Sequence, residues 1–280
     1  MHSSNPLTKH FRHPVLHFKL PSGGKYWPDG SLNLPINGEI PIFPMTTRDE
    51  IVLRTPDALM NGAGVVEVIQ SCCPNIADAW GMPSIDVDAV LIAIRIASYG
   101  SEMEIETTCP SCNETSNFDI PLSPILDRLG MPSYDKKVPT GDVVISIKPQ
   151  AYFETTKLNI VRFQEDQIIR TISNTDITDD ERKLQFDEQM KRLVDLNLDM
   201  LVASTDNITT VEGEIVRDHG FIKEFYANSD NRVIKLVRAR LNELTKESAI
   251  PEQPITCPDC SHNYKLSLEF DQASFFATGS

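Results

Sequence analysis

Apolar residues recur at helical spacing over much of the chain. Three long segments show this pattern, at residues 83–99, 151–173 and 178–203. The first is apolar around nearly its whole circumference but too short to cross a membrane, which predicts a helix buried in a core. The last carries a single apolar stripe, formed by Phe186, Met190, Leu193, Val194, Leu198 and Leu201. Such a stripe is more typical of packing in a core than of a partner site.

The first 45 residues lack this pattern and are rich in Pro and Gly. They predict short extended pieces joined by turns at Pro28-Asp29-Gly30 and Asn37-Gly38. The second turn predicts a β-hairpin, because Asn and Gly tolerate the positive φ angles of tight turns. Helices follow Pro44, and Thr46 or Thr47 is expected to cap the first of them.

Short strands are predicted where β-branched and alternating residues replace the helical pattern. They fall at residues 103–108, 118–122, 143–148 and 208–216. The expected class is α+β, mainly helical with short β-hairpins. The chain divides into an extended segment with a hairpin at 1–45, a helical core with the first Cys pair at 46–130, a strand and helical insertion at 131–250, and the second Cys pair with a C-terminal strand at 251–280.

Two Cys-x-x-Cys pairs are the clearest chemical signal. They stand in Thr-Cys-Pro-Ser-Cys at 108–112 and Thr-Cys-Pro-Asp-Cys at 256–260. After each pair an Asn precedes an aromatic residue, Phe118 or Tyr264, so each pair predicts the turn of a small β-hairpin. Two such turns facing each other supply four thiolates for one tetrahedral zinc ion: Cys109, Cys112, Cys257 and Cys260. Because 144 residues separate the pairs, against about 15–20 in ordinary zinc ribbons, the ribbon is expected to be split by an insertion.

Other interpretations of the cysteines remain open. Two redox Cys-x-x-Cys motifs, free structural cysteines and an iron–sulfur cluster are the alternatives, and His262 is an alternative ligand in place of one thiolate. Zinc is favoured because the flanks predict hairpins and not the βαβ context of a redox motif. Four thiolates leave no open position for water, which predicts one structural zinc per chain. Cys72 and Cys73 are expected to be small buried residues at a helix end.

Charge and missing motifs narrow the function. The formal net charge of −14 argues against nucleic-acid binding and against attachment to an anionic membrane. No apolar run approaches the length of a membrane span, and the N-terminal residues do not resemble a signal peptide, so a cytoplasmic protein is expected. The sequence contains no phosphate loop, no Gly-x-Ser-x-Gly and no His-Glu-x-x-His, and we expect no enzymatic activity.

Several segments resemble a viral protein family. They read PSGGKYWPDG at 21–30, PMTTRDEIVLRTPDALMNGAGVVEVIQSC at 44–72, DVDAVLIAIRIASYG at 86–100 and MEIETTCPSC at 103–112. Together they are similar to the T4-type bacteriophage baseplate hub assembly proteins over about residues 18–130. The chain departs from the pattern at Trp27, which is inserted between Tyr26 and Pro28.

The resemblance implies a late protein of a contractile-tailed phage. It implies an assembly factor or chaperone of the baseplate hub that acts in the host cytoplasm or stays in the virion tail baseplate. The implied partners are other tail or hub proteins, with the tape-measure protein among the candidates. No catalytic residues come with the family. The alternatives from the cysteines are a zinc-ribbon adaptor for nucleic acid and a Cys-x-x-Cys redox protein.

Overall fold

The computed structural model describes residues 5–55, 62–174, 179–268 and 275, with side chains between 165 and 189 left out. The chain forms two compact units. Unit 1 comprises residues 1–130 and 250–280, and unit 2 comprises residues 131–249. Unit 2 is therefore inserted into the sequence of unit 1, and each unit has its own set of buried apolar residues.

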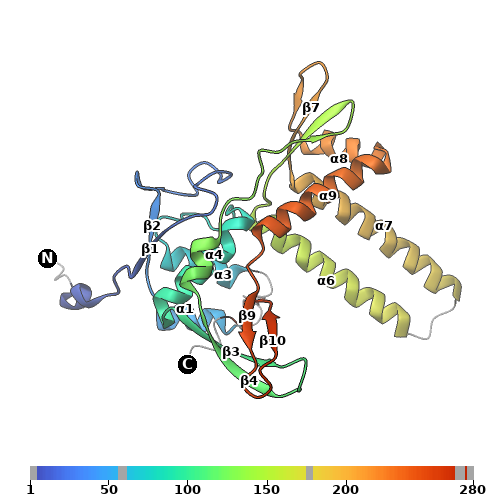
Figure 1. The fold of residues 1–280 in the computed structure, drawn as a ribbon. Coiled ribbons are helices and arrows are strands. Elements are labelled where there is room, and N and C mark those ends of the chain that lie inside the picture. The colour runs from blue at the N-terminus through green and yellow to red at the C-terminus, as the bar shows by residue number, and fades with distance from the viewer. Residues whose placement is uncertain (1–4, 56–61, 175–178, 269–274, 276–280) are drawn as a thin grey trace. The chain divides into compact units, whose positions relative to one another are not determined.

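Unit 1 combines helices with pairs of short antiparallel strands (Figure 1). Its helical elements are η1 (Pro6–His10), α1 (Thr47–Leu53), α3 (Ala63–Cys72), α4 (Ser84–Tyr99) and α5 (Ser123–Arg128). Its strands are β1 (Leu16–Lys19), β2 (Glu39–Ile42), β3 (Glu102–Thr108), β4 (Thr115–Pro121), β9 (Gln253–Thr256) and β10 (Asn263–Leu266). The strands pair as β1–β2, β3–β4 and β9–β10.

Helix α4 lies in the core of unit 1. Ten of its residues are buried, and α3, α5, β1 and β2 all pack against it. The prediction of a buried helix from its all-round apolar pattern is confirmed. Pro83 occupies the N-cap position of α4, and Ser84 is its first helical residue.

The Asn37-Gly38 turn forms, but it does not close the hairpin that it predicted. Gly38 has a φ of 73°, and its N–H donates to the carbonyl oxygen of Pro35 at 2.8 Å. The strand that follows, β2, pairs with β1, so a long loop and not a two-residue turn joins the two strands. Burial of Ile40 and Ile42 places β2 against α4, and this long-range packing is invisible in the local turn signal.

Unit 2 packs four helices with one small sheet. The helices are α6 (Tyr152–Asn174), α7 (Asp179–Ala203), α8 (His219–Asn228) and α9 (Asn231–Ser248). The antiparallel sheet has the order β5 (Val138–Pro139), β6 (Val143–Ile147), β7 (Thr205–Thr210) and β8 (Ile215–Val216). The core brings together apolar residues of the sheet and of α7, α8 and α9, among them Ile145, Ile208, Leu201, Ile222 and Val237. None of the described helices is both long and apolar enough to cross a membrane.

Among its described side chains, the apolar stripe of α7 packs in the core at the C-terminal end. Leu201 is buried and Leu198 packs against the core of unit 2. One and two turns earlier, Val194 is 58% exposed and Met190 is 43% exposed. Phe186 lies outside the described side chains. The interpretation of the stripe as core therefore applies to the C-terminal turns of α7.

The α+β class is confirmed, because helices and short antiparallel strands occupy separate stretches of the chain. Helices account for 43% of the residues. They exceed the strands without forming a majority of the chain, so the expectation of a mainly helical protein was too strong.

Candidate metal centre

The four cysteines of the two Cys-x-x-Cys pairs meet in unit 1. Their sulfur atoms all lie within 4.8 Å of one another. The Sγ atoms of Cys109 and Cys260 are 3.7 Å apart, and those of Cys112 and Cys257 are 3.6 Å apart. A tetrahedral zinc with Zn–S bonds of about 2.3 Å places its sulfurs about 3.8 Å apart. The sulfur positions therefore fit a four-thiolate metal site.

The first pair forms the turn between β3 and β4. Thr108 and Thr115 face each other at the last register position of this hairpin. The N–H of Cys109 donates to the carbonyl oxygen of Glu114 at 2.9 Å, and the N–H of Asn113 donates to the carbonyl oxygen of Cys109 at 2.9 Å. These two bonds close a tight loop that directs both thiols to the same side.

The second pair repeats this turn between β9 and β10. Thr256 faces Asn263, the N–H of Cys257 donates to His262 at 2.9 Å, and the N–H of Ser261 donates to Cys257 at 3.0 Å. The tips of hairpins β3–β4 and β9–β10 lie together in Figure 1, although they come from distant parts of the sequence. Two copies of one local turn thus supply the four sulfurs.

The turns and the neighbouring thiols shift the pKa values of the first pair in opposite directions. Burial acts to raise the pKa of the Cys109 thiol, but hydrogen bonds from the backbone of Cys112 and Ser111 and from the thiols of Cys112 and Cys260 outweigh it and lower the pKa to about 7. The Ser111 N–H lies 3.4 Å from the Cys109 sulfur. A backbone hydrogen bond from Glu114 acts to lower the pKa of Cys112, but burial and the three other thiols raise it to about 12. A thiolate is the form that binds metal, so Cys109 is the thiol of this turn that ionises more readily.

The other candidate ligands lie outside the cluster. His262 is exposed and its ring stacks on Tyr264, with 6.2 Å between the ring centroids. Its side chain is not part of the four-residue group found among the described residues. Cys72 and Cys73 are buried, and burial raises the pKa of Cys72 to about 12. Both behave as the small buried residues that the sequence predicted.

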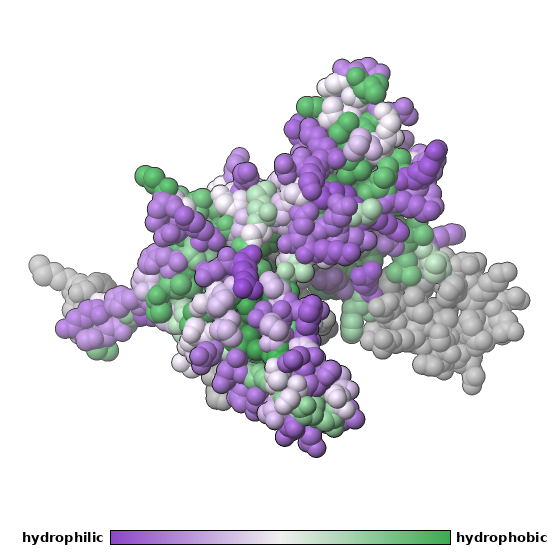
Figure 2. Space-filling view, in the orientation of Figure 1, coloured by the Kyte–Doolittle hydropathy of each residue, from purple (hydrophilic) through white to green (hydrophobic). Residues whose placement is uncertain are grey.

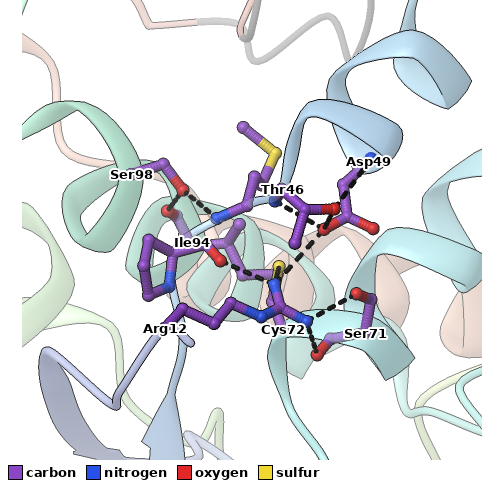
Figure 3. Close-up of polar contacts among 9 residues, drawn as sticks. Arg12, Thr46, Asp49, Ser71, Cys72, Ile94 and Ser98 are labelled. Carbon is purple, nitrogen blue, oxygen red and sulfur yellow. Dashed lines mark hydrogen bonds and ion pairs between the residues drawn. The ribbon is translucent and has the colours of Figure 1, made fainter. Parts of the chain in front are cut away.

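A partly buried polar clamp holds the PMTTRDE segment, and sequence reasoning missed its central residue, Arg12 (Figure 3). The guanidinium donates to the carbonyl oxygens of Pro44 at 2.6 Å and Ser71 at 2.8 Å, and it pairs with Asp49 at 3.2 Å. Asp49 also accepts from the N–H of Thr46 at 2.7 Å, which completes the capping box of α1. One arginine thus joins the N-terminal segment to α1 and α3.

A second buried network ties the PSGGKYWPDG segment to α4. The Asp86 carboxylate accepts from the Ser22 N–H at 2.8 Å, the Ser22 hydroxyl at 2.5 Å and the Trp27 indole N–H at 2.8 Å. Burial raises the pKa of Asp86, and these hydrogen bonds offset part of that effect. The inserted Trp27 therefore has a structural role in unit 1, because its indole N–H binds Asp86 in the first turn of α4.

These features define a class of α+β protein in which paired Cys-x-x-Cys turns and buried polar contacts tie together distant segments. A family model described as T4 bacteriophage base plate protein matches residues 13–277. Because the match covers nearly the whole chain, the protein belongs to this family. No curated protein and no solved structure matches the chain. The match confirms the resemblance of residues 18–130 to T4-type baseplate proteins and extends it through unit 2.

Family membership gives the general setting of the protein. A baseplate protein works in the phage tail, in contact with other tail proteins.

Proposed function

We propose that the protein acts in assembly of the baseplate hub through contacts with other hub and tail proteins. The match to the base plate family over residues 13–277 carries this proposal. The tape-measure protein is one candidate partner. The role is that of a scaffold or chaperone and not of an enzyme, working in the host cytoplasm and in the tail baseplate.

One structural zinc ion per chain is the second part of the proposal. Cys109, Cys112, Cys257 and Cys260 hold it and complete a zinc ribbon that unit 2 splits in sequence. Sulfur separations of 3.6 and 3.7 Å, close to the edge of a zinc–thiolate tetrahedron, support this assignment. Four thiolates leave no position for a reacting water, so the ion contributes to folding and not to catalysis.

The zinc staple assigns a role to each part of the chain. The segment from residue 251 onward carries the second turn, which the ion fastens to the first turn within residues 46–130. The insertion at 131–250 and the N-terminal 45 residues are then free to provide surfaces for partners. This division of labour accords with the two units of the fold.

Metal analysis tests the proposed zinc site. Freshly purified, reduced protein should contain one zinc per chain. Cys257→Ser should lose the zinc and much of the thermal stability. Cys73→Ala, which removes a thiol outside the cluster, should keep the zinc. Wild-type protein without zinc, or with iron in its place, would overturn the assignment.

Phage assembly tests the hub role. A phage lacking the protein should produce tails without completed hubs, and the wild-type gene supplied in trans should restore them. Tagged protein from infected cells should carry identifiable hub or tail proteins. Recovery of nucleic acid or metabolites alone, or normal hubs in the deletion phage, would contradict the proposal.

A further inference from the structure

The N-terminal arm, residues 5–19, contains η1 and β1 and is basic, whereas the rest of the chain is acidic. The first 28 residues contain four Lys and Arg residues and no Asp or Glu. The remaining residues carry all 40 acidic residues of the chain against 22 Lys and Arg. Within the arm, Arg12 pairs with Asp49. Lys9 and Lys19 are exposed and form no ion pair with a described residue, so their charges are available to a partner.

The arm also displays apolar side chains. Helix η1 buries none of its residues, and Leu7, Phe11 and Val15 are 62%, 57% and 65% exposed. Three exposed imidazoles lie among them: His10, His13 and His17. The contacts of Arg12 and the pairing of β1 with β2 anchor the arm at its C-terminal end. The arm therefore presents positive charge, hydrogen-bond donors and apolar surface on an anchored segment.

Hairpin β3–β4, also in unit 1, has the complementary charge on its open face. Its other face is covered, with Met103 and Ile120 buried. The open face carries four exposed carboxylates: Glu102, Glu104, Glu106 and Asp119. None of them forms an ion pair with a described residue, and residues 96–127 contain six Asp and Glu but no Lys or Arg. This face is therefore an uncompensated negative surface within the described part of the chain.

The register of the hairpin places like charges directly opposite each other. Glu104 faces Asp119 across the two strands, and the nearby Asn117 amide donates to Glu104 at 2.7 Å without supplying a positive charge. Like charges in such positions destabilise a sheet. Glutamates at alternate positions of β3 also share this face, about 7 Å apart. A cationic segment laid on the face would reduce the repulsion among these carboxylates.

The arm and the hairpin do not neutralise each other within one chain. Among the described residues, no hydrogen bond or ion pair joins them, although both belong to unit 1. Figure 2 shows hydrophilic atoms in purple along the arm, at the left, and around the tip of hairpin β3–β4, at the bottom. Two surfaces of opposite charge that remain apart on one molecule can be satisfied by a second molecule of the same kind.

We propose that the N-terminal arm of one copy binds the open face of hairpin β3–β4 in a second copy. Lys9 and Lys19 supply the charge that this face lacks, and the imidazole N–H groups of the arm donate further hydrogen bonds to carboxylates. The face also offers methyl and ring carbons to Leu7 and Phe11. They belong to three exposed residues: Thr108, Thr115 and Pro121.

The net charge of the chain makes this contact depend on local complementarity. Each copy carries a formal net charge of −14, so two copies repel each other at long range. Association therefore requires that the arm and the acidic face meet directly. A reciprocal exchange of arms closes a dimer, whereas a one-way contact extends into a ring or a chain of copies. The contact joins copies of this chain and is separate from the proposed contacts with hub proteins.

Charge reversal tests the contact on the full-length, zinc-loaded protein. The arm variant carries Lys9→Glu and Lys19→Glu, and the face variant carries Glu102→Lys, Glu104→Lys and Glu106→Lys. Sedimentation equilibrium should show that the wild type self-associates and that each variant alone does so at least about tenfold more weakly, because like charges then meet. An equimolar mixture of the two variants should restore association, since the acidic arm of one meets the basic face of the other.

Two further variants locate the contact. Lys136→Glu combined with Lys137→Glu is the matched control, because it makes the same change in net charge at exposed positions of unit 2. This control should self-associate like the wild type. Phe11→Ser removes an exposed apolar side chain of the arm without changing the charge, and it should weaken self-association about tenfold.

Three outcomes would overturn the proposal. The first is a wild type that stays monomeric at every concentration, and the second is a mixture of the reversed variants that associates no better than either alone. The third is a monomer whose arm shifts a DNA fragment, with the shift lost in the arm variant, which would assign the arm to nucleic acid. The hub role is tested separately by the deletion phage, so it stands or fails independently of these results.

Discussion

Asn113 and Ser261 occupy equivalent positions in the two Cys-x-x-Cys turns, and both have positive φ, of 60° and 56°. Each follows the second cysteine of its pair, and each donates its N–H to the carbonyl oxygen of the first. Left-handed backbone is costly for residues with a Cβ, less so for Asn than for Ser. That both turns adopt it shows how strongly the hairpin and its hydrogen bonds determine the loop.

Replacing Ser261 with Gly should stabilise the zinc-loaded protein by about 0.5–1 kcal/mol, because Gly adopts positive φ without a Cβ clash. Asn113→Gly should gain less, since Asn already tolerates this region. Urea unfolding in excess zinc measures both. Ser261→Ala, which keeps the Cβ, is the control and should gain nothing; a destabilised Ser261→Gly would contradict the account.

Local patterns in the sequence predicted that the two Cys-x-x-Cys turns face each other, and the four sulfur atoms do lie together. Both Cys-x-x-Cys turns are encoded within a few residues, so the repeated Thr, Pro and Cys positions sufficed to suggest two similar hairpins. The Asn that precedes an aromatic residue in each flank does not mark equivalent positions, because the hairpin registers make Thr115 the equivalent of Asn263. Register depends on backbone hydrogen bonds, which single residues do not reveal.

Long-range polar contacts could not be predicted in the same way. Arg12 lies among exposed residues in a segment without helical or strand pattern, and its partner Ser71 is 59 residues away. Asp86 read as an ordinary acid in the first turn of a helix, while its partners Ser22 and Trp27 lie about 60 residues earlier. The spacing of apolar residues predicts which face of a helix or strand is buried. It does not predict which distant polar group contacts that face.

Removal of zinc should loosen one region and spare another. The proposed ion would fasten hairpins β3–β4 and β9–β10, each of which has only two strands and is weak alone. Chelation should therefore increase hydrogen exchange at least tenfold in both hairpins and leave the four-stranded sheet of unit 2 unchanged. Readdition of zinc should restore protection. Equal loss of protection in β6 and β7 would show that the ion supports the whole chain.

Loss of the Arg12 clamp should destabilise unit 1. Arg12→Ala removes hydrogen bonds to the carbonyl oxygens of Pro44 and Ser71 and leaves the buried Asp49 without its cation. The expected cost is about 2–4 kcal/mol in chemical unfolding, and Arg12→Lys should recover part of it.

A neighbouring ion pair provides the control for this clamp. Arg48 and Glu67 are 3.1 Å apart, but their side chains are 83% and 47% exposed. Arg48→Ala should change stability by no more than about 0.5 kcal/mol. If both alanine variants lower the free energy of unfolding by the same amount, the partial burial of the clamp does not explain the importance of Arg12.

The buried Asp86 should give the protein a distinctive dependence on pH. Because burial raises its folded pKa, the folded state holds this proton more tightly than the unfolded chain does. Between the unfolded pKa of about 3.9 and the raised folded pKa, the native state carries more protons. The contribution of Asp86 to the free energy of unfolding must therefore increase as the pH falls through that window, and decrease as the pH rises.

Comparison with Asp86→Asn isolates this effect, because the two proteins differ only in this side chain. Relative to Asp86→Asn, the wild type should gain stability in urea unfolding as the pH is lowered from 7 towards 4. Asp29→Asn removes a carboxylate from the exposed turn near Trp27 and controls for the loss of one charge. The difference in the free energy of unfolding between wild type and Asp86→Asn could instead stay constant or shrink on acidification. That result would show that the three hydrogen bonds outweigh burial in setting the pKa of Asp86. The Ser22–Asp86–Trp27 network would then stabilise the ionised carboxylate, and the PSGGKYWPDG segment would be held most firmly at neutral pH.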